Sequence, residues 1–241
     1  MSIIVYGALG SMGKMTVNYL ENIGENVIPI DAFSSSKKVS DTFPKSKVDA
    51  IIDFSHPNQL ESVLNYARAY LVPLVIATTG YDSQALEKIE EASKHIPIFK
   101  SSNLSYGVHV LKNILKAYTK DLELDYDIEI IEKHHKHKVD APSGTALLLK
   151  DAIVDGAKLE KKVIKDRTNN PAKRNDQEIG IVSVRAGSIV GEHTIIFSGL
   201  QDTITLTHQA HSKEIFAQGA YKACEFIKKQ HPGLYSMDDL I

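Results

Sequence analysis

One stretch of the chain gathers residues that carry protons and bind anions. It runs from residue 132 to residue 149 and reads EKHHKHKVDAPSGTALLL. Histidine exchanges protons near neutral pH, and lysine adds a positive charge and a transferable proton. The candidates here are His134, His135, His137 and Lys138. This cluster predicts a site that delivers a proton to an anionic substrate.

A Pro-Ser-Gly-Thr turn follows the cluster, and a helix is expected to begin near Ser143. The N–H groups of Gly144 and Thr145, with the Thr145 hydroxyl, suit a carboxylate at such a helix end. Together with Lys138 and His135 they favour a dicarboxylate substrate. A charge run is more often a solvated loop without a role, but the adjacent anion-binding turn argues against that interpretation.

Two other kinds of site compete for the same residues. His134, His135 and His137 lack the spacing of a helical His-x-x-x-His pair and have no cysteine partners, so we expect no metal. A nucleic-acid patch is disfavoured by the acidic surroundings and by the formal net charge of -2.

The apolar and polar residues of DYDIEII alternate, which predicts a strand with one wet face. The cluster is therefore expected on a loop between that strand and the helix.

The N-terminus has the pattern of a phosphate-binding turn. A buried strand is predicted at residues 3–6, and a helix follows in which Met15, Tyr19 and Ile23 recur at helical spacing. Between them lies GALGSMG, with Leu9 where the usual dinucleotide fingerprint has glycine. Asp31 follows the last glycine at about the ~20-residue spacing of a ribose-binding acid. An ordinary strand–turn–helix with a surface aspartate would show the same pattern.

The alternation of strands and helices continues to residue 100. Strands are predicted in DAIIDFS, VPLVIATTG and PIFKSSN, and amphipathic helices over residues 56–70 and 83–96. This order predicts an α/β, doubly wound parallel sheet of the Rossmann-like kind. The carboxyl ends of its strands read GALG, DFS, ATTG and SSNLS, which would let a cofactor lie against the backbone.

The second half changes to an α+β pattern with an open mixed sheet. A helix over 105–122 is expected to bury one stripe, formed by Val108, Leu111, Ile114, Leu115 and Tyr118. Three later strands, at 179–185, 188–197 and 202–209, are close together and are expected to be antiparallel. We expect domains at 1–104 plus 212–241 for the dinucleotide and at 105–211 for substrate binding and oligomerisation. The last helix would return to the first domain through Phe216, Ala220, Ala223 and Ile227.

The composition of the chain indicates its protein class and its cellular compartment. Cys224 is the only cysteine, so a disulfide framework is excluded. The N-terminus lacks the pattern of a secretory signal, and no apolar run approaches the roughly 20 residues of a membrane span. We expect a soluble, cytoplasmic protein that binds neither nucleic acid nor membrane.

These motifs together resemble the dihydrodipicolinate reductase family. The likeness spans the chain through GALGSMG, DFS, ATTG, SSNLSYGV, EKHHKHKVDAPSGTA and RAGSIVGEHTIIF. It implies NAD(P)H-dependent reduction of 4-hydroxy-tetrahydrodipicolinate on the diaminopimelate route to lysine, in a homotetramer joined through the sheets of its second domains. It also implies His134 and Lys138 as proton donors, and substrate contacts from His135, Gly144 and Thr145. The cofactor-binding residues that it implies are Gly7, Ala8, Leu9, Gly10, Ser11, Met12, Asp31, Ala77, Thr78, Thr79, Ser101, Ser102, Asn103 and Leu104.

The chain departs from the family pattern near the adenosine. The family often has arginine at the position of Ser11, and a basic residue where this chain has Ala32. Asp31 favours an unphosphorylated ribose and hence NADH, whereas Lys37 and Lys38 are close enough in sequence to reach a 2′-phosphate. The expectation is use of both NADH and NADPH.

Three other functions compete with this reductase. An aspartate-semialdehyde-type dehydrogenase needs a thiol nucleophile, but Cys224 is predicted on a packing face. A nicotinamide-sensing regulator would need a DNA-binding module for which the two domains leave no segment. The main alternative is an NAD(P)-dependent dehydrogenase of another small anionic or sugar-like substrate. The sugar dehydrogenases place Glu-Lys-Pro near the nicotinamide, which the EKH at Glu132 only imitates.

Overall fold

A computed structural model describes residues 1–34, 39–165, 167 and 172–241. Lys37 and Lys38, expected near a 2′-phosphate, lie outside the described residues. The chain divides into two compact units, one of residues 1–106 with 213–241 and one of residues 107–212. No described helix is long and apolar enough to cross a membrane.

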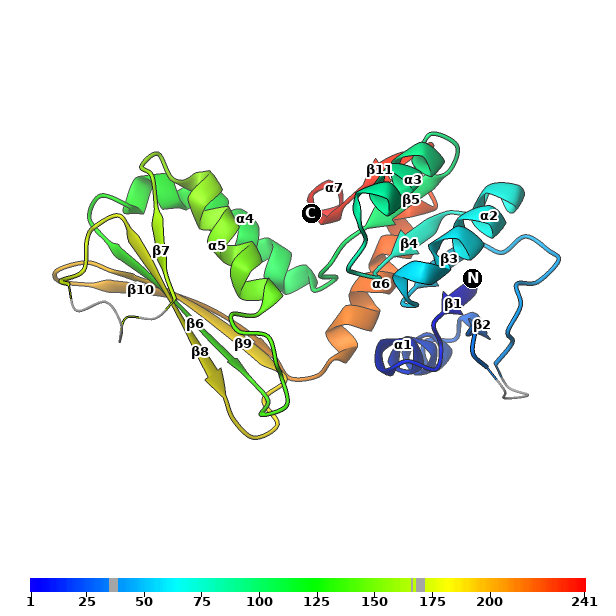
Figure 1. Ribbon diagram of the computed structural model, residues 1–241, viewed down its shortest axis with the longest axis horizontal. Helices are drawn as coiled ribbons and strands as arrows, with labels where there is room; N and C mark the ends of the chain where they lie inside the picture. The colour runs from blue at the N-terminus through cyan, green and yellow to red at the C-terminus, as the bar shows by residue number, and fades with distance from the viewer. Residues whose placement is uncertain (35–38, 166, 168–171) are drawn as a thin grey trace. The chain divides into compact units, whose positions relative to one another are not determined.

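The first unit is built on a six-stranded parallel sheet in the order β11-β5-β4-β3-β1-β2 (Figure 1). The strands are β1 Ser2–Tyr6, β2 Asn26–Ile30, β3 Ala50–Asp53, β4 Leu74–Ile76, β5 Pro97–Lys100 and β11 Gly233–Tyr235. The predicted doubly wound sheet is confirmed, and the C-terminal segment adds one edge strand to it. The strand order reverses direction between β1 and β3, which is where ligands bind in such sheets.

Helices cover both faces of this sheet. On one face lie α2 (Leu60–Tyr70), preceded by the 3₁₀ turn η1 (Pro57–Gln59), and α3 (Ser83–Ser93). On the other lie α1 (Ser11–Asn22), α6 (Glu214–Ile227) and the short α7 (Met237–Leu240) (Figure 1). Because both faces are buried, the strands read as continuous apolar runs. Ile4 and Ile51 face the first layer, and Ile3 and Val5 face the second.

Helices α6 and α1 differ in how well the sequence predicted their buried faces. In α6, Ala220, Ala223 and Ile227 are fully buried against the sheet as predicted. In α1, the stripe that includes Ile23 is not the buried face, because Ile23 is 44% exposed and follows the helix end. The buried residues are Gly13, Thr16 and Leu20. The start of this helix packs so closely on the glycine turn that small residues face inward.

The second unit holds a five-stranded mixed sheet in the order β10-β9-β6-β8-β7. Its strands are β6 Asp127–His134, β7 Lys162–Ile164, β8 Glu178–Arg185, β9 Gly191–Ser198 and β10 Thr203–Ala210. The antiparallel prediction holds for β9 with β10 and is wrong for β8, which pairs in parallel with β6. The connection from β6 to β8 passes through helix α5 (Gly144–Gly156) and the short strand β7, and helical crossovers of this kind connect parallel strands.

Helices α4 (Tyr106–Leu122) and α5 cover one face of this sheet (Figure 1). Val108, Leu111 and Leu115 of α4 are buried as predicted, but Ile114 and Tyr118 are 38% and 59% exposed. The predicted stripe was therefore too wide by those two residues. On the face of the sheet opposite these helices, Val182 and Val184 of β8 are exposed.

Candidate active site

Strand β6 carries the first residues of the basic cluster. Its alternation places Ile128 and Ile130 in the core, and the same face continues with Glu132 and His134. Glu132 is 0% exposed and His134 is 8% exposed. The prediction that the whole cluster lies on a loop is therefore wrong for His134, which is the last strand residue. The core of the sheet passes directly into a polar layer.

Glu132 lies at the centre of this polar layer. Arg185, opposite the end of β6 on β8, donates from Nη1 to Glu132 Oε2 over 2.8 Å and from Nη2 to Oε1 over 2.6 Å. His134 Nδ1 lies 2.5 Å from Oε2, and the backbone N–H of Ser143 donates to Oε1 over 3.2 Å. Burial raises the pKa of Glu132, but hydrogen bonds from Arg185, Ser183 and His134 outweigh it and lower the pKa to about 2. The carboxylate is ionised at neutral pH and accepts hydrogen bonds at both of its oxygens.

Two buried imidazoles meet in this layer. The rings of His134 and His193 of β9 are 5.1 Å apart and edge to face. Burial lowers the pKa of His134, while Glu132 raises it. Burial lowers the pKa of His193 to about 4, with the nearby His134 adding to the shift. His193 Nε2 lies 2.9 Å from the hydroxyl of Ser143, which accepts the Ala146 N–H and so caps α5.

The loop after β6 holds the other basic candidates. Lys138 makes an ion pair with Asp140 over 2.8 Å, and this contact lowers the pKa of Asp140. The backbone N–H of Lys138 donates to the His135 carbonyl over 3.1 Å, which closes a tight turn. His135 Nδ1 is buried and has no hydrogen-bond partner among the described residues. The described residues form no group of three metal-ligating side chains.

Helix α5 starts at Gly144, and Thr145 follows it. Gly144 is exposed, and a Cβ built on it meets no atom within 4 Å. Ser143 is 2% exposed and is fixed by Glu132 and His193. The structure thus places both predicted carboxylate-binding residues in the first turn of a helix whose start is anchored to the buried charges.

The glycine turn of the first unit is tightly closed. Gly7 has φ of 81°, and a Cβ there would lie 2.6 Å from the Phe54 carbonyl oxygen. A Cβ on Gly13 would lie 2.0 Å from the Gly7 oxygen. No side chain caps the first turn of α1, whose N-cap is Gly10. These features fit a pyrophosphate held by backbone N–H groups and by the positive end of the helix.

Asp31 follows β2 and is nearly buried. Its Oδ2 accepts the Leu9 N–H over 3.0 Å, and its Oδ1 accepts the Phe33 N–H over 3.1 Å. The predicted ribose acid therefore also fixes the glycine turn. Phe33 is 80% exposed beside it.

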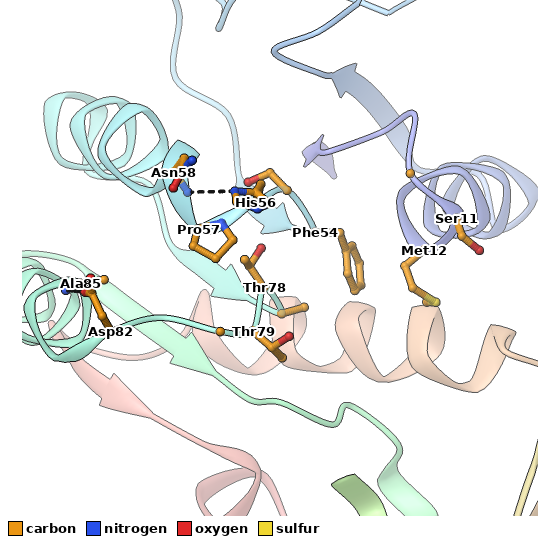
Figure 2. A pocket seen from close by; sticks show the side chains of 14 residues that line it. Ser11, Met12, Phe54, His56, Pro57, Asn58, Thr78, Thr79, Asp82 and Ala85 are labelled. Atoms are coloured by element: carbon orange, nitrogen blue, oxygen red, sulfur yellow. Dashed lines mark hydrogen bonds between the residues drawn. The ribbon is translucent and has the colours of Figure 1, made fainter. Parts of the chain in front are cut away.

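A cavity of about 730 Å³ opens from the glycine turn across the carboxyl ends of β3 and β4. Figure 2 shows Ser11 and Met12 at one end, Asp82 and Ala85 at the other, and Phe54 and Thr78 between them. Of the predicted residues, the cavity brings together Gly10, Ser11, Met12, Ala77, Thr78 and Thr79. A second hollow of about 260 Å³ is lined by Met12, Phe54, Ala77, Ser101, Ser102, Asn103, Leu104, Lys213 and Phe216. Gly7, Ala8 and Leu9 line neither hollow.

Several lining residues were not predicted. Phe54, His56, Pro57 and Asn58 follow β3, and Lys213 with Phe216 comes from the start of α6. The signal for the residues after β3 was the DFS strand end, but those residues were predicted only as the start of a helix, and Phe216 only as a packing residue of the last helix. Asp53, at the end of β3, is 0% exposed and accepts hydrogen bonds from Thr78 over 3.1 Å and Tyr81 over 3.3 Å. Burial raises the pKa of Asp53, although its hydrogen bonds oppose the shift. Through Thr78 and Tyr81, the carboxyl group ties the end of β3 to the segment that follows β4.

Comparison with known proteins accounts for both units. The family model "Dihydrodipicolinate reductase, N-terminus" matches residues 1–104, and "Dihydrodipicolinate reductase, C-terminus" matches residues 107–241. The chain belongs to the dihydrodipicolinate reductase family. Family relatives named 4-hydroxy-tetrahydrodipicolinate reductase include that of Clostridium novyi (strain NT), 46% identical over 99% of this chain and 97% of the relative. That of Clostridium tetani (strain Massachusetts / E88) is 44% identical over 99% and 96%.

Solved structures agree on the fold. The dipicolinate-bound dihydrodipicolinate reductase of Paenisporosarcina sp. TG-14 matches with a TM-score of 0.79 and 22% identity, over 100% of this chain and 99% of that one. Aspartate semialdehyde dehydrogenase II of Vibrio cholerae matches with a TM-score of 0.56 and 10% identity, over 95% and 99%. The dihydrodipicolinate reductase fold is thus shared with a dehydrogenase of another kind. Here Cys224 is fully buried and its pKa is raised by burial, which disfavours it as a nucleophile.

Sequence reasoning gave no role to three residues of the buried polar layer, Glu132, Arg185 and His193. Glu132 and Arg185 both lie within the quoted motifs, but neither was assigned a role. The signal for Glu132 was the alternation of the strand, since Glu132 is two residues beyond Ile130 and therefore lies on the same, buried face. Arg185 had no local signal, because its partner is 53 residues away in sequence.

Proposed function

We propose that this protein reduces 4-hydroxy-tetrahydrodipicolinate to tetrahydrodipicolinate with NADH or NADPH, on the diaminopimelate route to lysine. Its family membership over both units supports the reaction. The single observation that carries it furthest is the buried layer of Glu132, His134 and Arg185 beside the first turn of α5. That arrangement joins proton chemistry to a carboxylate-binding helix end, as a dicarboxylate substrate requires.

The first unit would hold the cofactor. The uncapped first turn of α1 suits the pyrophosphate, and Asp31 suits the ribose of the adenosine. Ala77, Thr78 and Thr79, with residues 101–104, would line the nicotinamide side. When bound, the reduced nicotinamide supplies the hydride that reduces the substrate ring.

The second unit would hold the substrate and supply the proton. Gly144 and Thr145 would bind one carboxylate through N–H groups and a hydroxyl, and His135 would contact the substrate beside them. Loss of the 4-hydroxyl as water leaves a cyclic, conjugated imine that would accept the hydride at C4, and the enamine or carbanion character that develops would take up a proton from the His134–Lys138 region. Holding the carboxylates against α5 and Lys138 would fix the ring in the reactive orientation.

A homotetramer formed through the second sheet completes the proposal. The exposed Val182 and Val184 on the face opposite α4 and α5 support an assembly surface there. We further propose that the protein acts in the cytoplasm, where a small anionic metabolite and a nicotinamide cofactor are both at hand.

A coupled assay tests the function. A purified synthase would condense pyruvate with aspartate semialdehyde, and the loss of reduced-nicotinamide absorbance would be followed with NADH and with NADPH. We expect loss that depends on the synthase. A folded sample that binds the cofactor but shows no loss would refute the reaction.

Lys138→Ala tests the assigned proton chemistry. We expect turnover to fall by about 100-fold or more, the lower end of general-acid contributions, with cofactor affinity nearly unchanged. Cofactor affinity would be measured by fluorescence titration with NADH. Unchanged turnover would remove Lys138 from the mechanism.

A further inference from the structure

We propose that Glu132 is a positioning residue that sets, with one carboxylate, both the orientation of the proton donor His134 and the start of the substrate-binding helix α5. The inference rests on the proposed function for the roles of His134 and α5. Glu132 is too deeply buried to touch substrate, being 0% exposed. Its action must pass through its neighbours.

The two oxygens of Glu132 serve different elements. Oε2 lies 2.5 Å from His134 Nδ1 on its own strand. Oε1 accepts the backbone N–H of Ser143, the N-cap of α5, over 3.2 Å. A carboxylate is planar and rigid, so a rotation that breaks one contact disturbs the other. The proton donor and the helix end are therefore held in a fixed geometry by one group.

Arg185 fixes the carboxylate in turn. Its two terminal nitrogens bind both Glu132 oxygens, and Nη1 and Nη2 also donate to the carbonyls of Val184 and Asp140 over 2.8 and 2.7 Å. A buried ion pair is expensive to desolvate, and well-packed apolar residues often stabilise a fold as well or better. Stability alone therefore does not explain this pair, whereas orientation of two functional elements does.

Glu132 also selects the tautomer of His134. An ionised carboxylate only accepts hydrogen bonds, so the proton between the two groups belongs to His134 Nδ1. When the ring is protonated on both nitrogens, Nε2 is then the nitrogen that gives its proton to substrate, and the neutral Nδ1–H imidazole remains afterwards. Gly191 on β9 leaves room at this nitrogen, because a Cβ there would lie 3.2 Å from Nε2. The charged and titratable groups around His134 are Glu132 on β6, Arg185 on β8, His193 on β9 and Lys138 on the loop.

Glu132→Gln is the decisive variant. It keeps the shape of the side chain but removes the charge and offers an amide donor to His134. We expect kcat to fall by about 100-fold, KM for the substrate to rise, and NADH affinity to stay unchanged. The pH above which kcat declines should move to lower values, because Glu132 raises the pKa of His134 and that contribution is lost.

Nitrogen NMR of the histidine side chains gives a readout independent of activity. The His134 signals, assigned by their absence in His134→Gln, should show the Nδ1–H tautomer in the wild type. They should show a changed or mixed tautomer in Glu132→Gln. The same tautomer in both proteins, or an unchanged kcat in Glu132→Gln, would overturn the proposal. If the wild type fails the coupled assay, the proposed function fails while this test still stands.

Two further proteins separate positioning from folding. Glu129→Gln is a matched control, since Glu129 lies on β6 with the opposite parity and pairs with Arg174 over 3.3 Å. It should change kcat by less than about twofold. The double variant Glu132→Gln/Arg185→Gln leaves no unpaired buried charge, so its unfolding midpoint should recover toward the wild type. A kcat that recovers together with stability would show that Glu132 acts only on the fold.

Discussion

The two units build their candidate sites from opposite materials. In the first unit the cavity is lined by the glycine turn, by small residues at the strand ends and by a few larger side chains, among them Phe54, His56 and Asp82, while Asp31 and Asp53 beside it are engaged in hydrogen bonds. In the second unit the site is a buried layer of charged and titratable side chains around Glu132. A dinucleotide cofactor always presents the same diphosphate, which backbone N–H groups can bind, whereas proton transfer needs side chains whose protonation is controlled.

This difference predicts opposite sensitivities. A backbone site is damaged when atoms are added. A Cβ on Gly7 or on Gly13 would lie 2.6 or 2.0 Å from a backbone oxygen, and the backbone there cannot move aside. A buried polar site is damaged when a partner is removed, because the remaining group loses its hydrogen bonds. It also responds to pH, since burial shifts the pKa values of its histidines.

The largest expected effect is on the backbone site. Gly13→Ala would push a methyl group against the Gly7 oxygen and displace the phosphate turn. We expect NADH binding to weaken by about 100-fold, which corresponds to about 2.8 kcal/mol. Fluorescence titration with NADH measures this directly. Gly10→Ala is the graded comparison, because its Cβ would lie 3.3 Å from the same oxygen and should cost less than about tenfold. Equal effects at both positions would contradict the steric explanation.

A smaller effect is expected at the helix end of the second unit. Thr145→Val keeps the shape of the side chain and removes the hydroxyl assigned to the substrate carboxylate. A hydrogen bond to a charged group contributes about 1.5 kcal/mol, so KM should rise by about tenfold with NADH affinity unchanged. Steady-state kinetics with Thr145→Ser, which restores the hydroxyl, should return KM toward the wild type. A change confined to NADH binding would place Thr145 in the wrong site.

The smallest expected change concerns stability rather than activity. The pKa of His193 is lowered to about 4 in the folded protein, so the unfolded chain binds the proton more readily. The free energy of unfolding should therefore fall as pH drops below about 6.5, the unfolded pKa, and continue to fall toward about pH 4. His193→Gln should flatten this part of the urea-denaturation profile. The exposed His231→Gln should leave it unchanged, and a flat wild-type profile would contradict the assigned burial effect.

Individual elements show where sequence reasoning succeeded and failed. The parallel sheet, the return of α6 through Ala220 and Ala223, and the turn at Gly7 follow from local periodicity and glycine spacing. The direction of β8 does not, since its partner β6 is fixed by a crossover rather than by the short gap to β9. The buried face of α1 was missed because it includes Gly13, which packs against the backbone of the glycine turn, and the polar Thr16, neither of which hydrophobic periodicity registers.

The sequence by itself therefore determined the fold class and the family, and it supplied most of the residues that we assign to the site. Motifs such as GALGSMG and KHKVDAPSGT act locally, so their chemistry is readable from spacing alone. Only the tertiary structure decided that Glu132 and Arg185 form the centre of the polar layer and that His193 joins it from β9. The physical reason is register: neighbouring strands bring residues more than 50 positions apart within hydrogen-bond distance, and no local pattern specifies which pairs will meet.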